Sequence, residues 1–191
     1  DYNGIGMANT GTGRHNDIQS VLIKMEEMGY DWRYVDVETY IKENNIPNLI
    51  IRGKRGAETK LFHEVLLMSF MCDGIIQRIS TGEYYLFEFK NQISFKYNNK
   101  TEVDKEHIDQ VSCYCTCLEL DKAFVLYENR DICNLECPEL LEVTEEMKEN
   151  VVNKVMECEG YVDRLIPPPV KKSAKLCRWC NYKIACEKAG N

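Results

Sequence analysis

Two carboxylates and a lysine stand at spacings that suit metal-assisted chemistry. They are Asp73 and, two residues apart, Glu88 and Lys90. Residues two apart in a β-strand project from one face. Carboxylate oxygens are the ligands that Mg²⁺ and Mn²⁺ prefer, and a lysine beside them can orient a water or neutralise a phosphoryl transition state. An isolated Glu-x-Lys tripeptide is more often ordinary surface charge, so the surrounding residues decide its meaning.

A histidine near the N-terminus is a further candidate ligand. Gly11 and Thr12 precede His15, which we expect to open an amphipathic helix over residues 16–28 that Gly29 ends. A lone histidine is more often structural than a ligand.

A polar pair is the third feature of this kind. Gln110 and Tyr114 are four residues apart and share one face of a helix that we predict over 106–118. They can hydrogen-bond a DNA phosphate or Lys90, or form a satisfied polar pair at the edge of the core.

Hydrophobic patterning predicts the elements that must position these residues. Apolar and aromatic runs predict strands over 64–71, leading into 72–76, and over 84–90, joined through a turn at 80–83. This antiparallel hairpin would bring Asp73 beside Glu88. Helices at 36–44 and 145–164 and a strand at 122–127 complete an α/β domain with a mixed central sheet flanked by helices.

Length and composition favour one globular core. The 191 residues are 44% hydrophobic, which suits a single domain. No apolar run approaches the roughly 20 residues of a membrane span, and the first residues lack the order of a signal peptide. We therefore expect an intracellular, cytoplasmic protein without a membrane partner.

The net charge of −7 is unusual for a protein that contacts phosphates. Basic residues nevertheless cluster at two places, and each cluster can follow a nucleic-acid backbone or be solvated surface. The first cluster is Arg52, Lys54, Arg55 and Lys60, and the second is Lys171, Lys172, Lys175, Arg178 and Lys183.

The C-terminal tail carries three of the ten cysteines. Cys177, Cys180 and Cys186 form the pattern C-x-x-C-x5-C, which can hold a metal atom or a cluster, although three thiolates are one short of the usual four ligands. Prolines at 167–169 end the last helix. We predict a core at residues 1–166 and a tail at 167–191 that packs back on it.

These motifs together resemble the RecB-like branch of the PD-(D/E)xK nuclease superfamily, and within it the CRISPR-associated and phage exonucleases that carry an iron–sulfur cluster. The resemblance implies a restriction-endonuclease-like fold. It implies metal binding by His15, Asp73, Glu88 and the backbone carbonyl of Phe89, catalysis by Lys90 with Glu88 and Asp73, and support of the site and DNA by Gln110 and Tyr114. The family's proline before the first acid is replaced here by Cys72.

The resemblance also implies a four-iron, four-sulfur cluster on Cys177, Cys180 and Cys186. The family's fourth cysteine precedes the histidine motif, but here no cysteine precedes Cys72. We expect that ligand upstream of Asp1, and structural zinc is the alternative.

The expected function is a Mg²⁺- or Mn²⁺-dependent deoxyribonuclease, an exonuclease on single-stranded or frayed DNA that uses a metal-activated water. The alternative is a non-catalytic DNA-binding or assembly subunit that keeps the nuclease fold. For the nuclease and for the non-catalytic subunit alike, we expect DNA as a ligand and a helicase, an integrase or a recombination protein as a partner. The sequence contains no phosphate loop of the G-x-x-x-x-G-K-[ST] type.

Overall fold

The computed structural model describes residues 2–55, 58–97, 101–165, 177–178, 180–181 and 183–188, with the side chains of 2–12 and 185 left out. The chain divides into two compact units, Asp1–Val152 and Asn153–Asn191, so that the division falls within one helix. The predicted linker prolines lie outside the described residues. The predicted core and tail, and their packing, remain a prediction.

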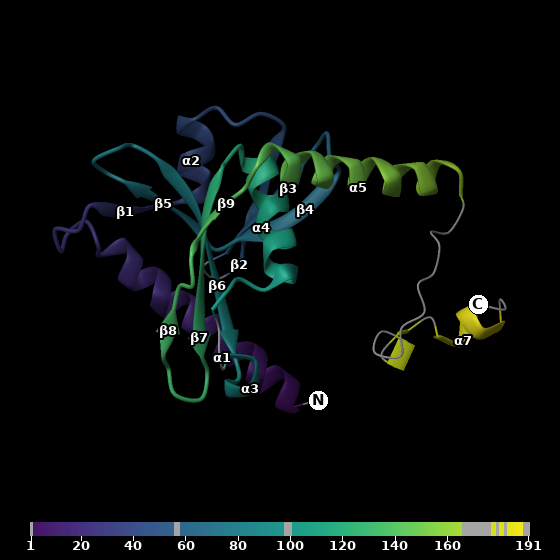
Figure 1. Cartoon of the computed structure of the whole chain (residues 1–191), viewed down its shortest axis with the longest axis horizontal. Coiled ribbons are helices and arrows are strands. Elements are labelled where there is room, and N and C mark those ends of the chain that lie inside the picture. The colour runs from purple at the N-terminus through teal and green to yellow at the C-terminus, as the bar shows by residue number, and fades with distance from the viewer. Residues whose placement is uncertain are drawn as a thin grey trace. The chain divides into compact units, whose positions relative to one another are not determined.

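The first unit contains a six-stranded sheet and a three-stranded sheet (Figure 1). The larger has the order β1-β5-β6-β7-β8, with β9 also paired to β7. Its β6 and β7 are parallel and its other pairs antiparallel, which confirms the predicted mixed sheet. It comprises β1 (Trp32–Val35), β5 (Gly74–Arg78), β6 (Tyr84–Gln92), β7 (Lys122–Asn129), β8 (Leu135–Glu136) and β9 (Leu140–Glu142). The smaller comprises β2 (Leu49–Arg55), β3 (Glu58–His63) and β4 (Met68–Cys72).

Helices pack on both faces of the larger sheet. On one face, Ile18 of α1 packs in a cluster with Phe87 and Phe89 of β6. On the other, α2 and α4 contribute to the main core, which also includes the inner side of the smaller sheet. Among the described residues of both units, the helices are α1 (Tyr2–Ile23), α2 (Val37–Glu43), α3 (Ser94–Tyr97), α4 (Lys105–Leu118), α5 (Glu145–Asp163) and, in the second unit, α7 (Lys183–Lys188). Because β6 and β7 run parallel, a crossover must join them, and it contains α3 and α4.

The first helix differs from the prediction at both ends. It begins at Tyr2 instead of residue 16, so His15 lies inside α1 and does not open it. It ends at Ile23, and a series of turns leads to Gly29, whose φ of +82° suits glycine. The apolar spacing continued through these turns, so spacing alone could not locate the end of the helix.

The prediction of a strand over 64–71 was wrong for residues 64–67. Residues 64–67 form the turn of the β3–β4 hairpin, in which the backbone N–H of Leu66 donates to Nδ1 of His63 at 3.1 Å. Val65 and Leu67 are exposed there despite being apolar. The predicted hairpin with β6 does exist, but its first strand is β5, and β4 belongs to the smaller sheet.

None of the described helices is both long enough and apolar enough to cross a membrane.

Candidate metal centre

Asp73 is the one residue between β4 of the smaller sheet and β5 of the larger sheet. The register of β3 and β4 pairs Thr59 with Cys72, so the next position places Glu58 opposite Asp73. The register of β5 and β6 pairs Gly74 with Phe87, so the next position there places Glu88 opposite Asp73. Both ladders therefore align a glutamate with the same aspartate.

The carboxylate of Asp73 is fixed by two hydrogen bonds. Nδ1 of His15 donates to its Oδ1 at 2.8 Å, and the backbone N–H of Phe89 donates to its Oδ2 at 2.7 Å. Phe89 lies beyond the last residue pair between β5 and β6, so the Asp73 side chain takes the place of a missing strand partner. The His15 ring also meets the Phe89 ring edge to face, with centroids 5.0 Å apart.

The charge of His15 responds to the same neighbours. Burial opposes protonation of the imidazole, but the hydrogen bond to Asp73 and the negative charges of Asp73, Glu58 and Glu88 outweigh it, so the pKa of His15 is raised. A cation that binds His15 must therefore displace a proton more often than at a free histidine.

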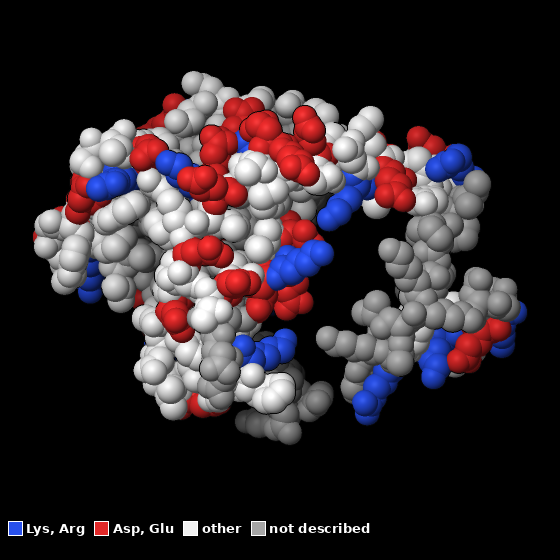
Figure 2. Space-filling model, in the orientation of Figure 1, with Lys and Arg blue, Asp and Glu red and all other residues white. Residues whose placement is uncertain are grey.

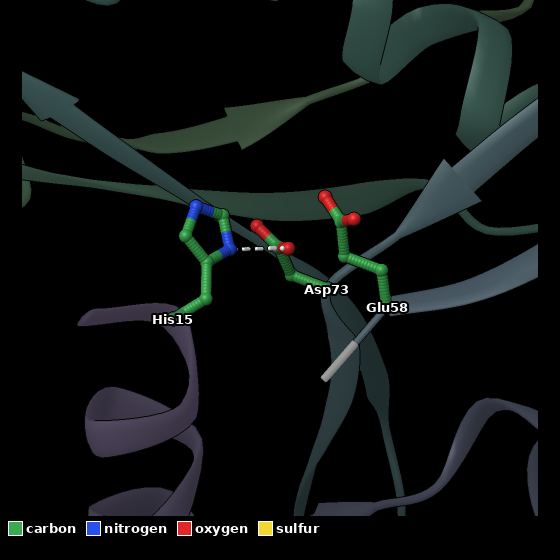
Figure 3. Close-up of side chains that lie close together, drawn as sticks. All are labelled: His15, Glu58 and Asp73. Atoms are coloured by element: carbon green, nitrogen blue, oxygen red, sulfur yellow. Dashed lines mark hydrogen bonds and ion pairs between the residues drawn. The ribbon is translucent and has the colours of Figure 1, made fainter. Parts of the chain in front are cut away.

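Glu58 joins this pair and was not among the residues predicted from sequence. Each of the three residues offers one ligand atom, and these atoms of His15, Glu58 and Asp73 all lie within 4.8 Å of one another. Figure 3 shows the three side chains converging from α1, from β3 and from the residue between β4 and β5. This donor set is one nitrogen and several carboxylate oxygens. Mn²⁺ binds both kinds of donor readily, whereas Mg²⁺ would bind the carboxylate oxygens.

Glu88 is buried beside this group, with 5% of its surface exposed. Lys90 donates to its Oε1 at 2.8 Å, while no described residue donates to its Oε2. Burial, together with the charge of Asp73, raises the pKa of Glu88 to about 8 even though Lys90 lowers it. An unpaired buried carboxylate oxygen is destabilising, and a cation in the adjoining cleft would relieve it.

Lys90 connects Glu88 to helix α4. Its Nζ donates to Oε1 of Gln110 at 2.7 Å, and Nε2 of Gln110 donates to the hydroxyl of Tyr114 at 2.6 Å. Burial raises the pKa of Tyr114, so its hydroxyl keeps the proton and can donate it to another acceptor. The predicted shared faces of Glu88 with Lys90 and of Gln110 with Tyr114 are thus confirmed.

A buried ion pair anchors α1 next to His15. Glu128 of β7 is 1% exposed, and its carboxylate accepts hydrogen bonds from the guanidinium of Arg14. Nδ2 of Asn91 donates to the same carboxylate at 2.6 Å. Burial alone would raise the pKa of Glu128, but these donors lower it, so the carboxylate is ionised.

A cleft of about 500 Å³ adjoins this group of side chains. Arg130 adds a cation to its wall, and Nε of Arg130 donates to Oδ1 of Asn91 at 2.7 Å. The cleft is lined by His15, Glu58, Ser69, Phe70, Met71, Glu88, Phe89, Lys90, Asn91, Gln110, Tyr114 and Arg130.

The structure brings the other predicted residues of the main site together around this cleft, and Asp73, which is not among the lining residues, is hydrogen-bonded to His15 and Phe89, which are. Glu88 belongs to the cleft but not to the group within 4.8 Å, so its predicted role as a metal ligand remains a proposal, as does that of the Phe89 carbonyl. Gly11 and Thr12 lie in the part of α1 whose side chains are not described.

The three cysteines of the tail are not among the groups of possible metal ligands in the described residues. Cys186 lies in α7, and Cys177 and Cys180 precede it. Among the described residues, the three thiols are not a group whose ligand atoms lie within 4.8 Å of one another. The cluster and the zinc alternative both remain predictions.

Comparison with known proteins supports the fold. No family model and no curated protein matches the chain. The crystal structure of SSO0001 matches with a TM-score of 0.51 and 16% identity, over 95% of this chain and 71% of that one. At this identity the likeness establishes the arrangement of the elements alone.

Proposed function

We propose that the protein is a Mg²⁺- or Mn²⁺-dependent deoxyribonuclease that acts as an exonuclease on single-stranded or frayed DNA. The observation that carries the proposal is the convergence of His15, Glu58 and Asp73 within 4.8 Å of one another. His15 and Glu58 line the same cleft as Glu88 and Lys90. The order of motifs that resembles RecB-like nucleases supports the same assignment.

The residues fit a divalent cation by their chemistry and by their present state. Asp73 and Glu58 offer oxygens and His15 a nitrogen, while Oε2 of the buried Glu88 has no donor among the described residues. A cation held there would lower the pKa of a water and stabilise charge on the phosphoryl oxygens. This stabilisation is the largest contribution that phosphodiester hydrolysis needs from the site.

The remaining residues position charge around the scissile phosphate. Lys90 is held between Glu88 and Gln110, so its ammonium is oriented before substrate arrives and can hold the attacking water or a phosphate oxygen. The Tyr114 hydroxyl, whose oxygen accepts from Gln110, keeps a proton for a phosphate oxygen. Arg130 lines the same cleft and can neutralise a further phosphate.

The experiment is cleavage of end-labelled single- and double-stranded DNA with Mg²⁺ or Mn²⁺, comparing wild type with Glu88→Ala and Lys90→Ala. Glu38→Ala and Lys42→Ala are matched controls, because these residues form an ion pair of the same type on the solvent-facing side of α2. Loss of metal-dependent cleavage in the first two variants alone supports the proposal, and the product ladder shows whether the enzyme acts from ends.

The alternative, a DNA-binding or assembly subunit without activity, gives a different result. Folded wild type then binds DNA but cuts nothing with either metal. A helicase, an integrase or a recombination protein would be the partner to search for in that case.

A further inference from the structure

The outer face of the smaller sheet continues directly from the candidate metal centre. Alternate residues of a strand share a face, so Glu58, Lys60 and Phe62 of β3 point to one side. Thr59, Leu61 and His63 point to the other and are buried. The outer face therefore begins at the metal ligand Glu58 and extends along β3.

The neighbouring strands extend this face in register. Lys60 pairs with Met71 of β4, and Phe62 pairs with Ser69. Met71 and Ser69 line the cleft of the metal centre and also line a second cavity of about 400 Å³ over the smaller sheet. The two hollows thus share part of their lining and adjoin each other on this face.

Positive charge is concentrated in this second cavity. Its lining includes Arg52, Lys54, Arg55 and Lys60, and none of the described lining residues carries a carboxylate, in a chain whose net charge is −7. By contrast, acidic side chains gather over the beginning of α5 on the face shown in Figure 2. Lys54 is paired with Asp36 at 2.6 Å. Among the described residues, no carboxylate lies at ion-pair distance from the other three cations, so their charge is open to a ligand.

Arg52 is presented in an unusual way. The register between β2 and β3 shifts between Ile51 and Gly53, which makes Arg52 the extra residue of a β-bulge. Its guanidinium lies over the Phe62 ring, 3.8 Å from the centroid. The stack keeps a flat cation on the sheet surface, and such a plane can stack on a base while its edge bonds a phosphate.

We propose that this face, defined by Arg52, Arg55, Lys60 and Phe62, binds single-stranded DNA and directs it to the metal centre. The identity of the ligand as DNA rests on the proposed function, while the charge and the stacked guanidinium come from the face itself. A single strand exposes both phosphates and base planes, so it uses both features. A duplex hides its base planes and uses the charge alone.

The test is binding of a fluorescent oligothymidylate of about 15 nucleotides to the full chain in EDTA, which prevents cleavage. Arg52→Ala/Lys60→Ala is compared with Lys24→Ala/Lys42→Ala, which removes the same charge from exposed positions elsewhere. We expect the first pair to weaken binding roughly tenfold. We expect the slope of log K against log salt to fall by about 1.4, or 0.7 for each lost phosphate contact.

A third variant separates stacking from charge. Arg52→Lys keeps the charge but loses the plane, so we expect an unchanged salt slope and roughly fivefold weaker binding. The proposal is overturned if Arg52→Ala/Lys60→Ala binds like its control, or if a duplex of the same length binds as tightly as the single strand.

The outcome is separable from that of the proposed function. Binding that depends on this face in a protein that never cuts DNA would end the nuclease proposal and leave the binding face. If Arg52→Ala/Lys60→Ala cuts and binds DNA as wild type does, the binding face is ruled out and the nuclease proposal stands.

Discussion

Nδ1 of His15 lies 2.8 Å from Oδ1 of Asp73, although 58 residues separate them in the chain. The contact joins α1 to the point where the two sheets meet, since Asp73 is the residue between β4 and β5. Asp73 is thereby aligned with Glu58 on one side and Glu88 on the other. The candidate site thus depends on the alignment of two strand ladders.

Glu58→Gln should weaken binding of Mn²⁺ by at least about tenfold, because it removes one carboxylate from the group with His15 and Asp73. Titration of the EDTA-treated protein followed by electron paramagnetic resonance or calorimetry measures this. Glu64→Gln is the matched control, since Glu64 is exposed in the adjacent hairpin turn. Equal affinity in both variants would remove Glu58 from the site.

The stability of the metal-free protein should fall as pH rises from about 5 to 8. The pKa of Glu88 is about 8 in the folded chain against an ordinary value of 4.5, so the native state keeps a proton that the unfolded state has lost. The slope is at most about 1.4 kcal/mol per pH unit for this group. His15 acts in the same direction, because its raised pKa gives stability that is lost as pH rises through the folded value.

Urea denaturation in EDTA at several pH values measures this slope. Glu88→Gln should flatten it, whereas Glu145→Gln, whose side chain is 82% exposed, should leave it unchanged. Addition of Mn²⁺ at pH 8 should raise the stability of the wild-type protein again, because metal binding favours the ionised carboxylate of Glu88. A slope that persists in full in Glu88→Gln would contradict the assignment.

Glu128→Gln should lower both stability and metal affinity. It leaves Arg14 without its buried anionic partner, at a cost of about 1–3 kcal/mol, and it loosens α1 next to His15. Asp17→Asn removes the exposed pair of the same Arg14 and should cost less than about 0.5 kcal/mol. If Glu128→Gln changed stability but not the Mn²⁺ dependence of cleavage, the pair would be structural only.

Gly74→Ala should destabilise the protein by about 1–3 kcal/mol, because a Cβ there would lie 2.4 Å from Cε2 of Tyr34. In a Tyr34→Ala background the same change should cost much less. Gly13→Ala is the control, since nothing lies within 4 Å of its Cβ and the residue is helical. It should stabilise by about 0.5–1 kcal/mol. Denaturation curves of wild type, the three single variants and the Tyr34→Ala/Gly74→Ala double variant measure these differences.

Full-length protein purified without oxygen should contain iron and labile sulfide, and substitution of Cys177, Cys180 or Cys186 by serine should remove both. Cys133→Ser, at an exposed thiol of the first unit, is the control. Stoichiometric zinc without sulfide would replace the cluster by the zinc alternative.

The sequence determined which side chains could do the chemistry. Glu88 with Lys90, and Gln110 with Tyr114, are separated by one strand or helix repeat, so their shared faces follow from local periodicity alone. The β5–β6 hairpin is local in the same sense.

Only the tertiary structure decided which of these side chains meet. Glu58 joins His15 because β3 pairs with β4 in one register, and a shift of a single residue would turn it to the buried face. The turn at 64–67 joins β3 to β4 locally, but Glu58 meets His15 only where α1 packs against the sheet, and α1 and β3 are far apart in the chain. The apolar turn at 64–67 escaped prediction because its exposure is decided by neighbours that the local sequence does not contain.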